Sequence, residues 1–440
     1  MNKFKVIISG GGTGGHLFPA LSIANELRHR FPEVDMLFVG ADNRMEMERV
    51  PAAGYRIIGL PVSGFNRRNP LKNFRVLVRL VKSLRLARKI IRDFKPDIAI
   101  GVGGYASGPT LWMASSLSIP VLIQEQNSYA GLTNKLLGKR AAKICVAYGG
   151  MEKYFPDDRI VITGNPVRKE LELVAEKIVL KQEIVDTKQE TFAATIDQFS
   201  EAYSYFGLDA GKPVLLILGG SLGARTINNS IQKGLNVLMD EGVQVIWQTG
   251  RGVNYELQTF LSVKIKQCVA LRSETITNYE TTPSRAQSRT CSSYAEAQRS
   301  SFPEGEKLRG IWVGEFITRM DYAYAVADLV VSRAGAGTLS ELCLLKKATI
   351  LVPSPNVAED HQTKNAHALS ENNAAILVPD HAAEEQLVMT AIELLKDKKR
   401  LQVLSGNIAR FAQPDSTKRI VDEVVKLTGY QSNQKADEHK

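Results

Sequence analysis

Seven consecutive residues near the start of the chain combine groups suited to phosphate binding and proton transfer. They are Gly10, Gly11, Gly12, Thr13, Gly14, Gly15 and His16. Glycines let backbone amides approach a phosphate closely, and a helix beginning near His16 adds the positive end of its dipole. Unperturbed histidine titrates near neutrality, so His16 is a candidate base. A capping or hydrogen-bonding role for His16 is the competing interpretation.

The spacing of Gly10, Gly12 and Gly15 also matches the dinucleotide-binding fingerprint, and Glu33 and Asp35 stand near the distance expected for a ribose-binding acid. Any diphosphate ligand satisfies the same physics, and a glycine turn that serves only tight packing remains an alternative. Three further glycine turns, at residues 101–109, 219–224 and 332–338, follow apolar runs. Four such turns predict a polar cleft floor, whereas a simple dehydrogenase needs only one.

Ten short apolar runs predict the strands that position these turns. They fall at residues 5–9, 35–39, 97–102, 121–124 and 144–147, and again at 214–218, 243–247, 329–332, 349–352 and 375–378. Helical patterns lie between them, so the chain is expected to be an α/β protein of two Rossmann-like, doubly wound domains. Ligands of such sheets bind beyond the carboxyl ends of the strands, which predicts a site in the cleft where the two domains face each other.

The same patterns predict where the domains begin and end. Residues 1–166 are expected to form the first domain, 167–207 an extended linker, and 208–411 the second domain. Residues 262–309 are rich in serine and threonine without apolar periodicity, so they are expected to be a loop inserted in the second domain. Residues 412–430 are expected to form a helix that packs back on the first domain, and 431–440 a polar tail.

Charge and composition narrow the classes of partner. The 440-residue chain carries a formal net charge of +10, which calls for nucleic acid, an acidic membrane surface or a phosphorylated substrate. The cations concentrate in residues 67–95, where Asp93 is the only acid. Four widely separated cysteines and the lack of an apolar leader predict a reducing cytoplasm, no zinc and no membrane span.

A helix over residues 71–84 would place Lys72, Arg75, Arg79 and Lys82 at spacings of three and four. Phe74, Leu77, Val78, Val81 and Leu84 would take the other side, with Val76 and Leu80 widening the apolar surface. An apolar band flanked by cations is typical of a helix lying in a membrane interface. A solvated basic face on a core helix is the alternative.

Six motifs occur together in one order, at residues 11–16, 125–127, 130–134, 164–168, 219–221 and 333–341. On these motifs the chain resembles the MurG family of GT-B glycosyltransferases, the undecaprenyldiphospho-muramoylpentapeptide β-N-acetylglucosaminyltransferases. The resemblance covers nearly the whole chain outside residues 173–200 and 262–309. It implies two partners: UDP-N-acetylglucosamine as donor and a muramyl-pentapeptide linked to undecaprenyl diphosphate as acceptor.

The resemblance also implies roles for individual residues. The first domain would bind the acceptor and the membrane, the second the UDP-sugar. Donor-site residues would be Thr13, Gly14, Gly15, Asn127, Arg168, Ser221, Ile317 through its backbone, Ala336, Gly337, Thr338, Leu339, Ser340, Glu341 and Gln362. Glu341 would accept hydrogen bonds from the ribose hydroxyls, or alternatively be a first-turn acid that complements the helix dipole. Tyr105 would line the acceptor side, or form an aromatic lid over the glycines.

The residues are consistent with an inverting transfer that needs no cofactor. The chain has no paired-aspartate metal motif, and Arg333 stands eight residues before Glu341, where retaining enzymes of similar architecture often carry a glutamate. Dipole and hydrogen-bond groups would then stabilise the leaving diphosphate, with stimulation by magnesium left open. Leu222 replaces a glutamine common in the family, which weakens the expected sugar contacts of that loop.

The family implies peripheral attachment at the cytoplasmic face of the inner membrane, and no nucleic-acid partner is expected. Two rival functions stay open. One is a nicotinamide-dependent oxidoreductase, which leaves the second glycine-turn domain and the basic helix unexplained. The other is a membrane-associated, non-catalytic nucleotide-sugar-binding subunit.

Overall fold

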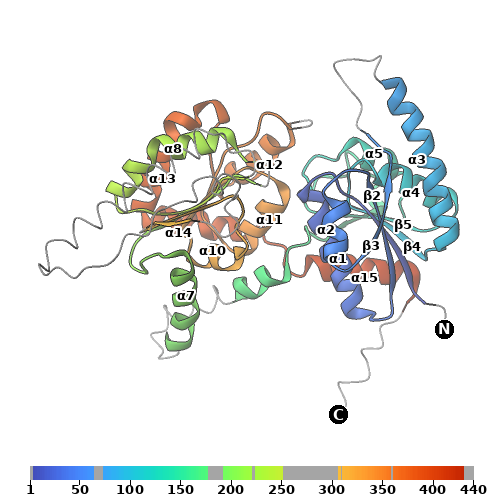
Figure 1. The fold of residues 1–440 in the computed structure, drawn as a ribbon, viewed down its shortest axis with the longest axis horizontal. Coiled ribbons are helices and arrows are strands. Elements are labelled where there is room, and N and C mark those ends of the chain that lie inside the picture. The colour runs from blue at the N-terminus through green and yellow to red at the C-terminus, as the bar shows by residue number, and fades with distance from the viewer. Residues whose placement is uncertain are drawn as a thin grey trace, which may run out of the picture.

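Two α/β domains make up the molecule (Figure 1). A computed structural model describes residues 3–63, 73–176, 192–220, 223–250, 306–308, 310–357 and 360–430, with only the backbone at Asn73, Arg75, 192–198 and 306–308. Each domain contains a seven-stranded sheet with helices on both faces. The predicted fold class, two Rossmann-like domains facing each other in the GT-B arrangement, is confirmed.

The N-terminal sheet is wholly parallel, in the order β3-β2-β1-β4-β5-β6-β7. Its strands are β1 (Lys5–Ser9), β2 (Asp35–Ala41), β3 (Arg56–Leu60), β4 (Ile98–Gly101), β5 (Val121–Glu125), β6 (Lys143–Val146) and β7 (Ile160–Ile162). Its helices are α1 (Gly14–Arg30), α2 (Glu46–Ala52), α3 (Asn73–Phe94), α4 (Ser107–Ser116), α5 (Leu132–Gly138) and the short 3₁₀ helix η2 (Asp157–Arg159). The direction of strand order reverses between β1 and β4, so their carboxyl ends open a crevice.

The C-terminal sheet has the order β10-β11-β9-β8-β12-β13-β14, parallel except for the β10–β11 pair. Its strands are β8 (Val214–Leu218), β9 (Gln244–Gln248), β10 (Glu306–Leu308), β11 (Ile311–Gly314), β12 (Leu329–Ser332), β13 (Thr349–Leu351) and β14 (Ile376–Leu377). Its helices are α7 (Phe192–Phe206), α8 (Arg225–Asp240), α10 (Met320–Val326), α11 (Ala336–Leu344), α12 (His361–Ser370), η5 (Asp380–Ala382), α13 (Ala383–Lys396) and α14 (Lys398–Ala409). The corresponding crevice lies between β8 and β12.

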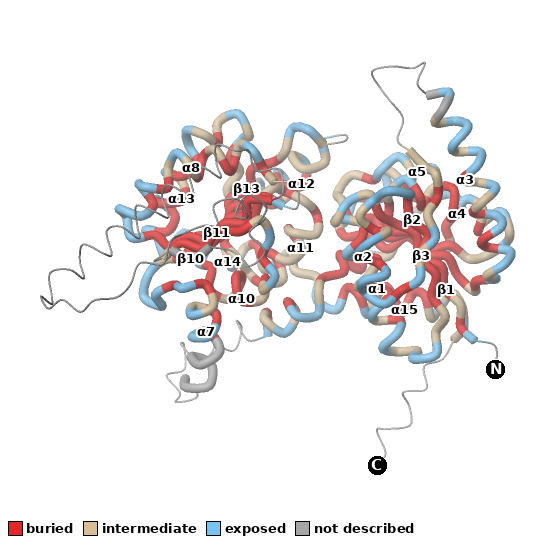
Figure 2. The backbone as a smooth tube through the Cα atoms, viewed as in Figure 1, coloured by how far each residue is buried: buried red, intermediate tan, exposed pale blue. Residues whose placement is uncertain are grey.

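Burial explains why the strands form where the apolar runs stand. Successive side chains of a strand point to opposite faces, so Val6 and Ile8 enter one core of the N-terminal domain while Ile7 enters the other. The C-terminal sheet divides Leu216 and Ile217 between two cores in the same way. Figure 2 shows the buried sheet strands at the centre of each domain, enclosed by helices with exposed outer faces. Covering both faces forces continuous apolar strands, which is the pattern that the sequence displays.

Part of the expected linker at 167–207 belongs to the core of the C-terminal domain. Residues 169–176 are helical, and α7 is a helix that packs on α10. Phe199, Ala202 and Phe206 recur at three and four along α7, and Ala202 and Phe206 belong to the core of the C-terminal domain. That domain therefore begins before residue 208, because the apolar face of α7 completes its core.

The expected insertion at 262–309 is also too long. Residues 306–308 form β10, which extends the sheet beyond β11 as an antiparallel edge strand. The rest of the predicted loop, like the tail at 431–440, lies outside the described residues.

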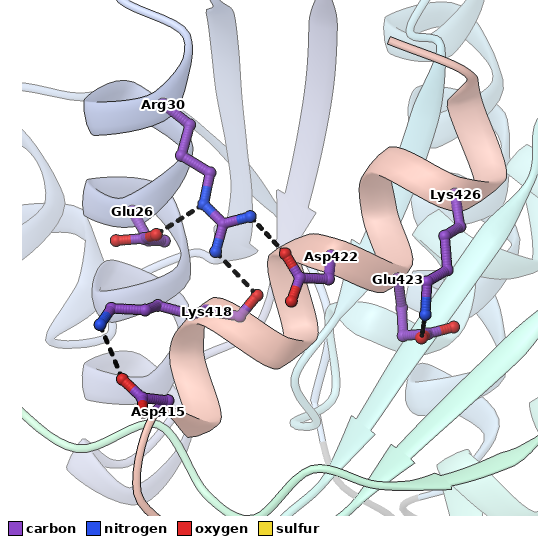
Figure 3. Close-up of polar contacts among 7 residues, drawn as sticks. All are labelled: Glu26, Arg30, Asp415, Lys418, Asp422, Glu423 and Lys426. Atoms are coloured by element: carbon purple, nitrogen blue, oxygen red, sulfur yellow. Dashed lines mark hydrogen bonds and ion pairs between the residues drawn. The ribbon is translucent and has the colours of Figure 1, made fainter. Parts of the chain in front are cut away.

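The last helix, α15 (Ser416–Thr428), returns to the N-terminal domain and packs along α1. Ile420, Val421 and Val424 are buried in the core beneath β1 and β4. At the surface Arg30 of α1 pairs with Glu26 and with Asp422 of α15, and also donates to the carbonyl oxygen of Lys418 (Figure 3). The chain therefore crosses between the domains twice.

Candidate active site

The two crevices face each other across a domain seam, and contacts from both sides bridge it. Asn165 Nδ2 donates to Ser340 Oγ over 2.9 Å, and Ser128 Oγ donates to Asn365 Oδ1 over 2.8 Å. Figure 1 shows α11 and α12 on the side of the C-terminal domain that faces the N-terminal domain. The seam where the sequence predicted a cleft therefore brings together polar residues of both domains, including the predicted Ser340.

The N-terminal glycine turn is held by a carboxylate of the protein itself. Glu46 is fully buried; its Oε2 accepts from the N–H of Gly12 (2.9 Å) and its Oε1 from the N–H of Ala41 (3.0 Å). Gly104 has φ +89°, and a Cβ there would lie 2.4 Å from the carbonyl oxygen of Gly11. The turns after β1 and β4 thus pack directly on each other, and a donor that a phosphate would need is already used. No pattern in the sequence pointed to Glu46.

The positions of Asp35 and Glu33 do not favour the dinucleotide-binding interpretation. Asp35 opens β2, so it lies at the amino edge of the sheet, and its carboxylate pairs with Arg56. Glu33 is exposed in the loop before that strand. A ribose-binding acid belongs near the carboxyl end of β2, beside the glycine turn. The oxidoreductase alternative is not favoured.

His16 lies in the first turn of α1, with its ring against Gly103 and a defined hydrogen-bond partner. Its Nδ1 is 3.1 Å from Oε1 of the buried Gln126. Gln126 Nε2 donates to the carbonyl oxygen of Val102 (2.7 Å) and to Oε1 of Gln124 (2.5 Å). Because Gln126 offers His16 only an acceptor, Nδ1 must carry the proton and Nε2 the lone pair.

Burial lowers the pKa of His16, although the charge of Glu125 acts in the opposite direction. A lowered pKa keeps the imidazole neutral at neutral pH. His16 is therefore held in the protonation state and tautomer of a general base.

Glu125 organises the loop that follows β5. Its Oε1 accepts from the N–H and Nδ2 of Asn127, and its Oε2 from the N–H of Gly131 and from Nδ2 of Asn134 (2.8 Å). A buried carboxylate with four donors fixes the path of the loop. Glu125 and Gln126 belong to the motif at 125–127, but no role was predicted for them; an acid at the end of a predicted strand was the available signal.

Asn365 on α12 is a bridging residue that sequence reasoning missed. It is buried, its Oδ1 accepts from the N–H and Oγ of Ser128, and its Nδ2 lies 3.4 Å from Asn127 Oδ1 and 3.3 Å from the carbonyl oxygen of Ala334. The residue stands three positions after Gln362, on the same helix. That spacing was the available signal. Asn365 ties the Asn127 loop to the C-terminal domain.

Glu341 on α11 meets Arg168 from the other side of the seam. Its Oε1 accepts from Arg168 Nε (3.3 Å) and from a terminal guanidinium nitrogen (3.1 Å), and its Oε2 accepts from the Tyr324 hydroxyl (2.9 Å). Burial, followed by the charge of Glu341, raises the pKa of Tyr324, so its hydroxyl stays protonated and donates. Arg168 and Glu341, both predicted to bind the donor nucleotide-sugar, thus form one partly buried ion pair.

The amino end of α11 points a row of backbone donors at the seam. The helix begins at Ala336 after Gly335, which is extended, and no side chain caps it. The first N–H groups of a helix have no partner within it and attract anions. Gly337, Thr338 and Ser340 are partly exposed there, whereas Leu339 is buried and packs in the core.

The remaining predicted residues are spread around the cleft. Thr13, exposed, precedes α1, which opens with Gly14 and Gly15; Tyr105, 56% exposed, lies on the turn after β4. The N–H of Ile317 already donates to Gln248 Oε1, so a hydrogen bond between Ile317 and the uracil base would have to use the Ile317 carbonyl oxygen. Gln362 accepts through Oε1 from the N–H of Ser354. Ser221 and Leu222 lie outside the described residues.

Arg333 has a structural role. It donates to the carbonyl oxygens of Val352 (3.0 Å) and Pro353 (3.2 Å) and pairs with Asp380, which also accepts from Thr226. The cation therefore ties β12 to the loops that follow β13 and β14.

The helix predicted at 71–84 corresponds to the first half of α3, which begins at Asn73 and continues to Phe94. Its exposed apolar side chains include Phe74 (72%), Leu77 (53%), Val78 and Val81, and Arg79 and Lys82 are exposed beside them. Lys72 lies outside the described residues, and the Arg75 side chain is not described. Across the described ranges, no helix combines the length and apolarity that a membrane crossing needs.

Comparison with known proteins agrees with this geometry. Profiles of the glycosyltransferase family 28 N-terminal and C-terminal domains match residues 6–146 and 214–420. A protein of Parabacteroides distasonis, named UDP-N-acetylglucosamine–N-acetylmuramyl-(pentapeptide) pyrophosphoryl-undecaprenol N-acetylglucosamine transferase, is 53% identical over 97% of this chain and 99% of its own. A Phocaeicola vulgatus protein of the same name is 50% identical over 97% of this chain and 96% of its own.

Solved structures point the same way. The crystal structure of Acinetobacter baumannii MurG has a TM-score of 0.64 and 25% identity, covering 96% of this chain and 99% of that one. A UDP-N-acetylglucosamine 2-epimerase, at 15% identity and a TM-score of 0.57 over 98% of both chains, shares the fold. The two matched family domains together span most of the chain. This chain belongs to glycosyltransferase family 28.

Proposed function

We propose that the chain transfers N-acetylglucosamine from UDP-N-acetylglucosamine to a muramyl-pentapeptide carried on undecaprenyl diphosphate. This proposal rests on sequence identity. Two relatives named for that reaction are 53% and 50% identical to this chain, over almost the full length of both sequences. The cleft supports it, because a helix amino end and a neutral histidine face one seam.

In the proposed reaction the acceptor's 4-hydroxyl oxygen attacks the anomeric carbon of the donor sugar. The hydroxyl proton passes to His16 Nε2, a β-glycosidic bond forms, and the bond from the sugar to the β-phosphate breaks with UDP leaving. One displacement inverts the α-linkage and needs no covalent sugar–enzyme intermediate. The tautomer set by Gln126 supports this role, since Nε2 holds the lone pair.

The leaving diphosphate would be stabilised by the amino end of α11 and by Arg168. The Arg168–Glu341 pair suggests how: Arg168 moves from the carboxylate to the diphosphate as the donor enters, and Glu341 then accepts hydrogen bonds from the ribose hydroxyls. Ser221, Ile317 and Gln362 complete the proposed donor site, and Tyr105 the acceptor side.

We also propose that α3 holds the enzyme to anionic lipid at the cytoplasmic face of the inner membrane. The exposed apolar side chains from Phe74 to Val81, beside Arg79 and Lys82, support this over a solvated basic face. A face that only met water would not leave four apolar side chains uncovered on consecutive turns.

The deciding experiment is a turnover assay with UDP-N-acetylglucosamine and lipid-linked acceptor, run beside titrations of UDP and NADH. UDP binding with turnover supports the proposal. UDP binding without turnover would indicate the non-catalytic subunit, and NADH binding without UDP binding would restore the oxidoreductase. Adding EDTA should leave most of the turnover, because the proposed stabilising groups belong to the chain; loss of all turnover would indicate a required metal ion.

A further inference from the structure

Three lysines surround two tyrosine rings at one point of the seam. Tyr129 and Tyr154 meet edge to face, with centroids 5.1 Å apart. Lys135 Nζ lies 3.8 Å from the Tyr129 centroid and 4.5 Å from that of Tyr154. Lys364 Nζ lies 3.7 Å from the Tyr129 centroid, and Lys153 Nζ 5.1 Å from that of Tyr154. We call these five residues the lysine–tyrosine cluster.

The cluster lies beside the proposed reaction site and spans both domains. Tyr129 directly follows Asn127 and Ser128, the residues that contact Asn365 across the seam. Lys364 precedes Asn365 on α12 of the C-terminal domain, whereas Lys135 comes from α5 of the N-terminal domain. A ligand held by the cluster would therefore contact both domains next to the cleft.

The charge of the cluster is not cancelled by its aromatic contacts. A ring face attracts an ammonium group but carries no net charge. Within the described ranges, no carboxylate forms an ion pair with Lys135 or Lys153. The like charges of Lys135 and Lys153 around two adjacent rings repel each other, and an anion placed beside them relieves that repulsion.

Apolar side chains adjoin these cations on α5. Leu132 is 61% exposed and Leu136 is 63% exposed, one helical turn apart, with Lys135 between them in sequence. Exposed leucines one turn apart offer a surface for a hydrocarbon chain. Lys135 and Tyr129 are only partly exposed, so the cationic part is more sheltered than the leucines.

We propose that the lysine–tyrosine cluster binds a phosphate-ester anion whose hydrocarbon chain runs over Leu132 and Leu136. The inference rests on the proposed function, which supplies one source of such an anion, the diphosphate of the lipid-linked acceptor. A phospholipid headgroup is the other source of the same chemistry.

Direct binding is measured first, by calorimetry on enzyme saturated with UDP so that the donor site is filled. The probes are farnesyl diphosphate and inorganic pyrophosphate. Farnesyl diphosphate should bind more tightly, and the Lys135→Gln/Lys364→Gln double variant should lose about tenfold or more in its affinity, since charge-assisted contacts are lost. Lys139→Gln, at the exposed residue just after α5, is the matched control and should bind normally. Lys135→Arg should retain binding.

Two further arms separate the sources. If the acceptor's diphosphate is the ligand, the double variant raises the KM for acceptor in detergent while the Kd for UDP stays unchanged. If a headgroup is the ligand, it instead weakens sedimentation with phosphatidylglycerol vesicles. Normal farnesyl diphosphate affinity in the double variant, or equal affinity of the wild type for the two probes, would overturn the proposal. Absence of turnover in the wild type would reject the proposed function alone, because the calorimetry does not depend on it.

Discussion

The two domains share a core of six parallel strands in the same order but differ at the turns and helix ends that line the crevice. In the N-terminal domain the buried Glu46 accepts the Gly12 N–H, so an internal carboxylate occupies the turn. In the C-terminal domain α11, which follows β12, begins without a side-chain cap, as α1 does, and the nearby Glu341 is turned to Arg168 and Tyr324. The same fold thus supports a preset turn before His16 in one half and, in the other, a helix amino end that we propose binds the diphosphate.

The largest effect should come from the N-terminal half. Replacing His16 with alanine should lower kcat by about 10²- to 10⁴-fold, the usual range for loss of a general base, while UDP affinity stays unchanged. His29→Ala, exposed near the other end of the same helix, is the control. Near-normal turnover without His16 would move the base elsewhere in the cleft, and NMR showing an α-linked product would reject inversion.

The second-largest effect should be on membrane binding, and it should come from α3 of the N-terminal domain. Changing Lys72, Arg75, Arg79 and Lys82 to glutamine should abolish salt-sensitive sedimentation with phosphatidylglycerol vesicles, because each cation contributes about 1 kcal/mol near such a surface. UDP affinity should not change. Glutamine at four exposed lysines of the C-terminal domain, Lys212, Lys396, Lys398 and Lys399, is the charge-matched control. Undiminished sedimentation of the α3 variant would mean that the basic face is merely solvated.

In the C-terminal half we expect the opposite result, with UDP affinity reduced. Glu341→Ala should weaken UDP binding by about 1 to 3 kcal/mol, the cost of leaving hydrogen-bonding groups without partners. Thermal unfolding of the variant checks that the loss is local, because Arg168 and Tyr324 also lose a partner. Glu371→Ala, exposed in the same domain, is the control. Unchanged calorimetric UDP affinity in Glu341→Ala would remove this carboxylate from the donor site.

The pH dependence of kcat/KM should further separate the proposed base, His16, from the proposed UDP site. Because burial depresses the pKa of His16, its neutral, base-competent form persists to pH values below the ordinary 6.5, and the acid limb of kcat/KM should lie there. The same depression means that the stability His16 contributes is complete above pH 6.5 and is lost as the pH falls through the lowered pKa. UDP affinity, measured in parallel, should not follow that limb. An acid limb above pH 6.5 would contradict the assignment.

The smallest effect is expected from the serine- and threonine-rich segment of the C-terminal half. Residues 262–305 replaced by a short Gly-Ser bridge that keeps β10 should leave folding and UDP affinity nearly unchanged, because closure entropy varies slowly with loop length. Circular dichroism and calorimetry measure both. Collapse of the C-terminal domain would show that an element of its core lies in the segment.

Local patterns predicted the sheets well because burial on both faces imposes continuous apolar strands. Lys5–Ser9, Val214–Leu218 and Leu329–Ser332 have the predicted bounds, and the others differ by one or two residues. Four strands were missed. Arg56–Leu60 alternates with exposed positions and Ile160–Ile162 lies at the sheet edge, while Glu306–Leu308 fell inside the predicted insertion and Ile311–Gly314 directly follows it. The segment containing α7 was assigned to the linker, although its apolar spacing fits a helix that packs on the core.

The residues of the candidate site were likewise predicted only in part. Glycine turns and His16 were visible because their chemistry is written in adjacent residues. Glu46 acts on Gly12 across 34 positions, and Asn365 meets Ser128 across 237, so only the tertiary fold reveals them. The Arg168–Glu341 pair could not be foreseen, because each residue was assigned to a ligand rather than to the other.

The return of α15 has a consequence for how the protein forms during synthesis. Arg30 and Asp422 are 392 positions apart, and the core beneath β1 stays open on one side until Ile420, Val421 and Val424 have left the ribosome. The first domain to be translated is therefore the last to close, while the second can complete its core earlier. Nascent chains halted just before residue 416 should accordingly present an apolar groove along α1 to chaperones, and release of the last helix should withdraw it.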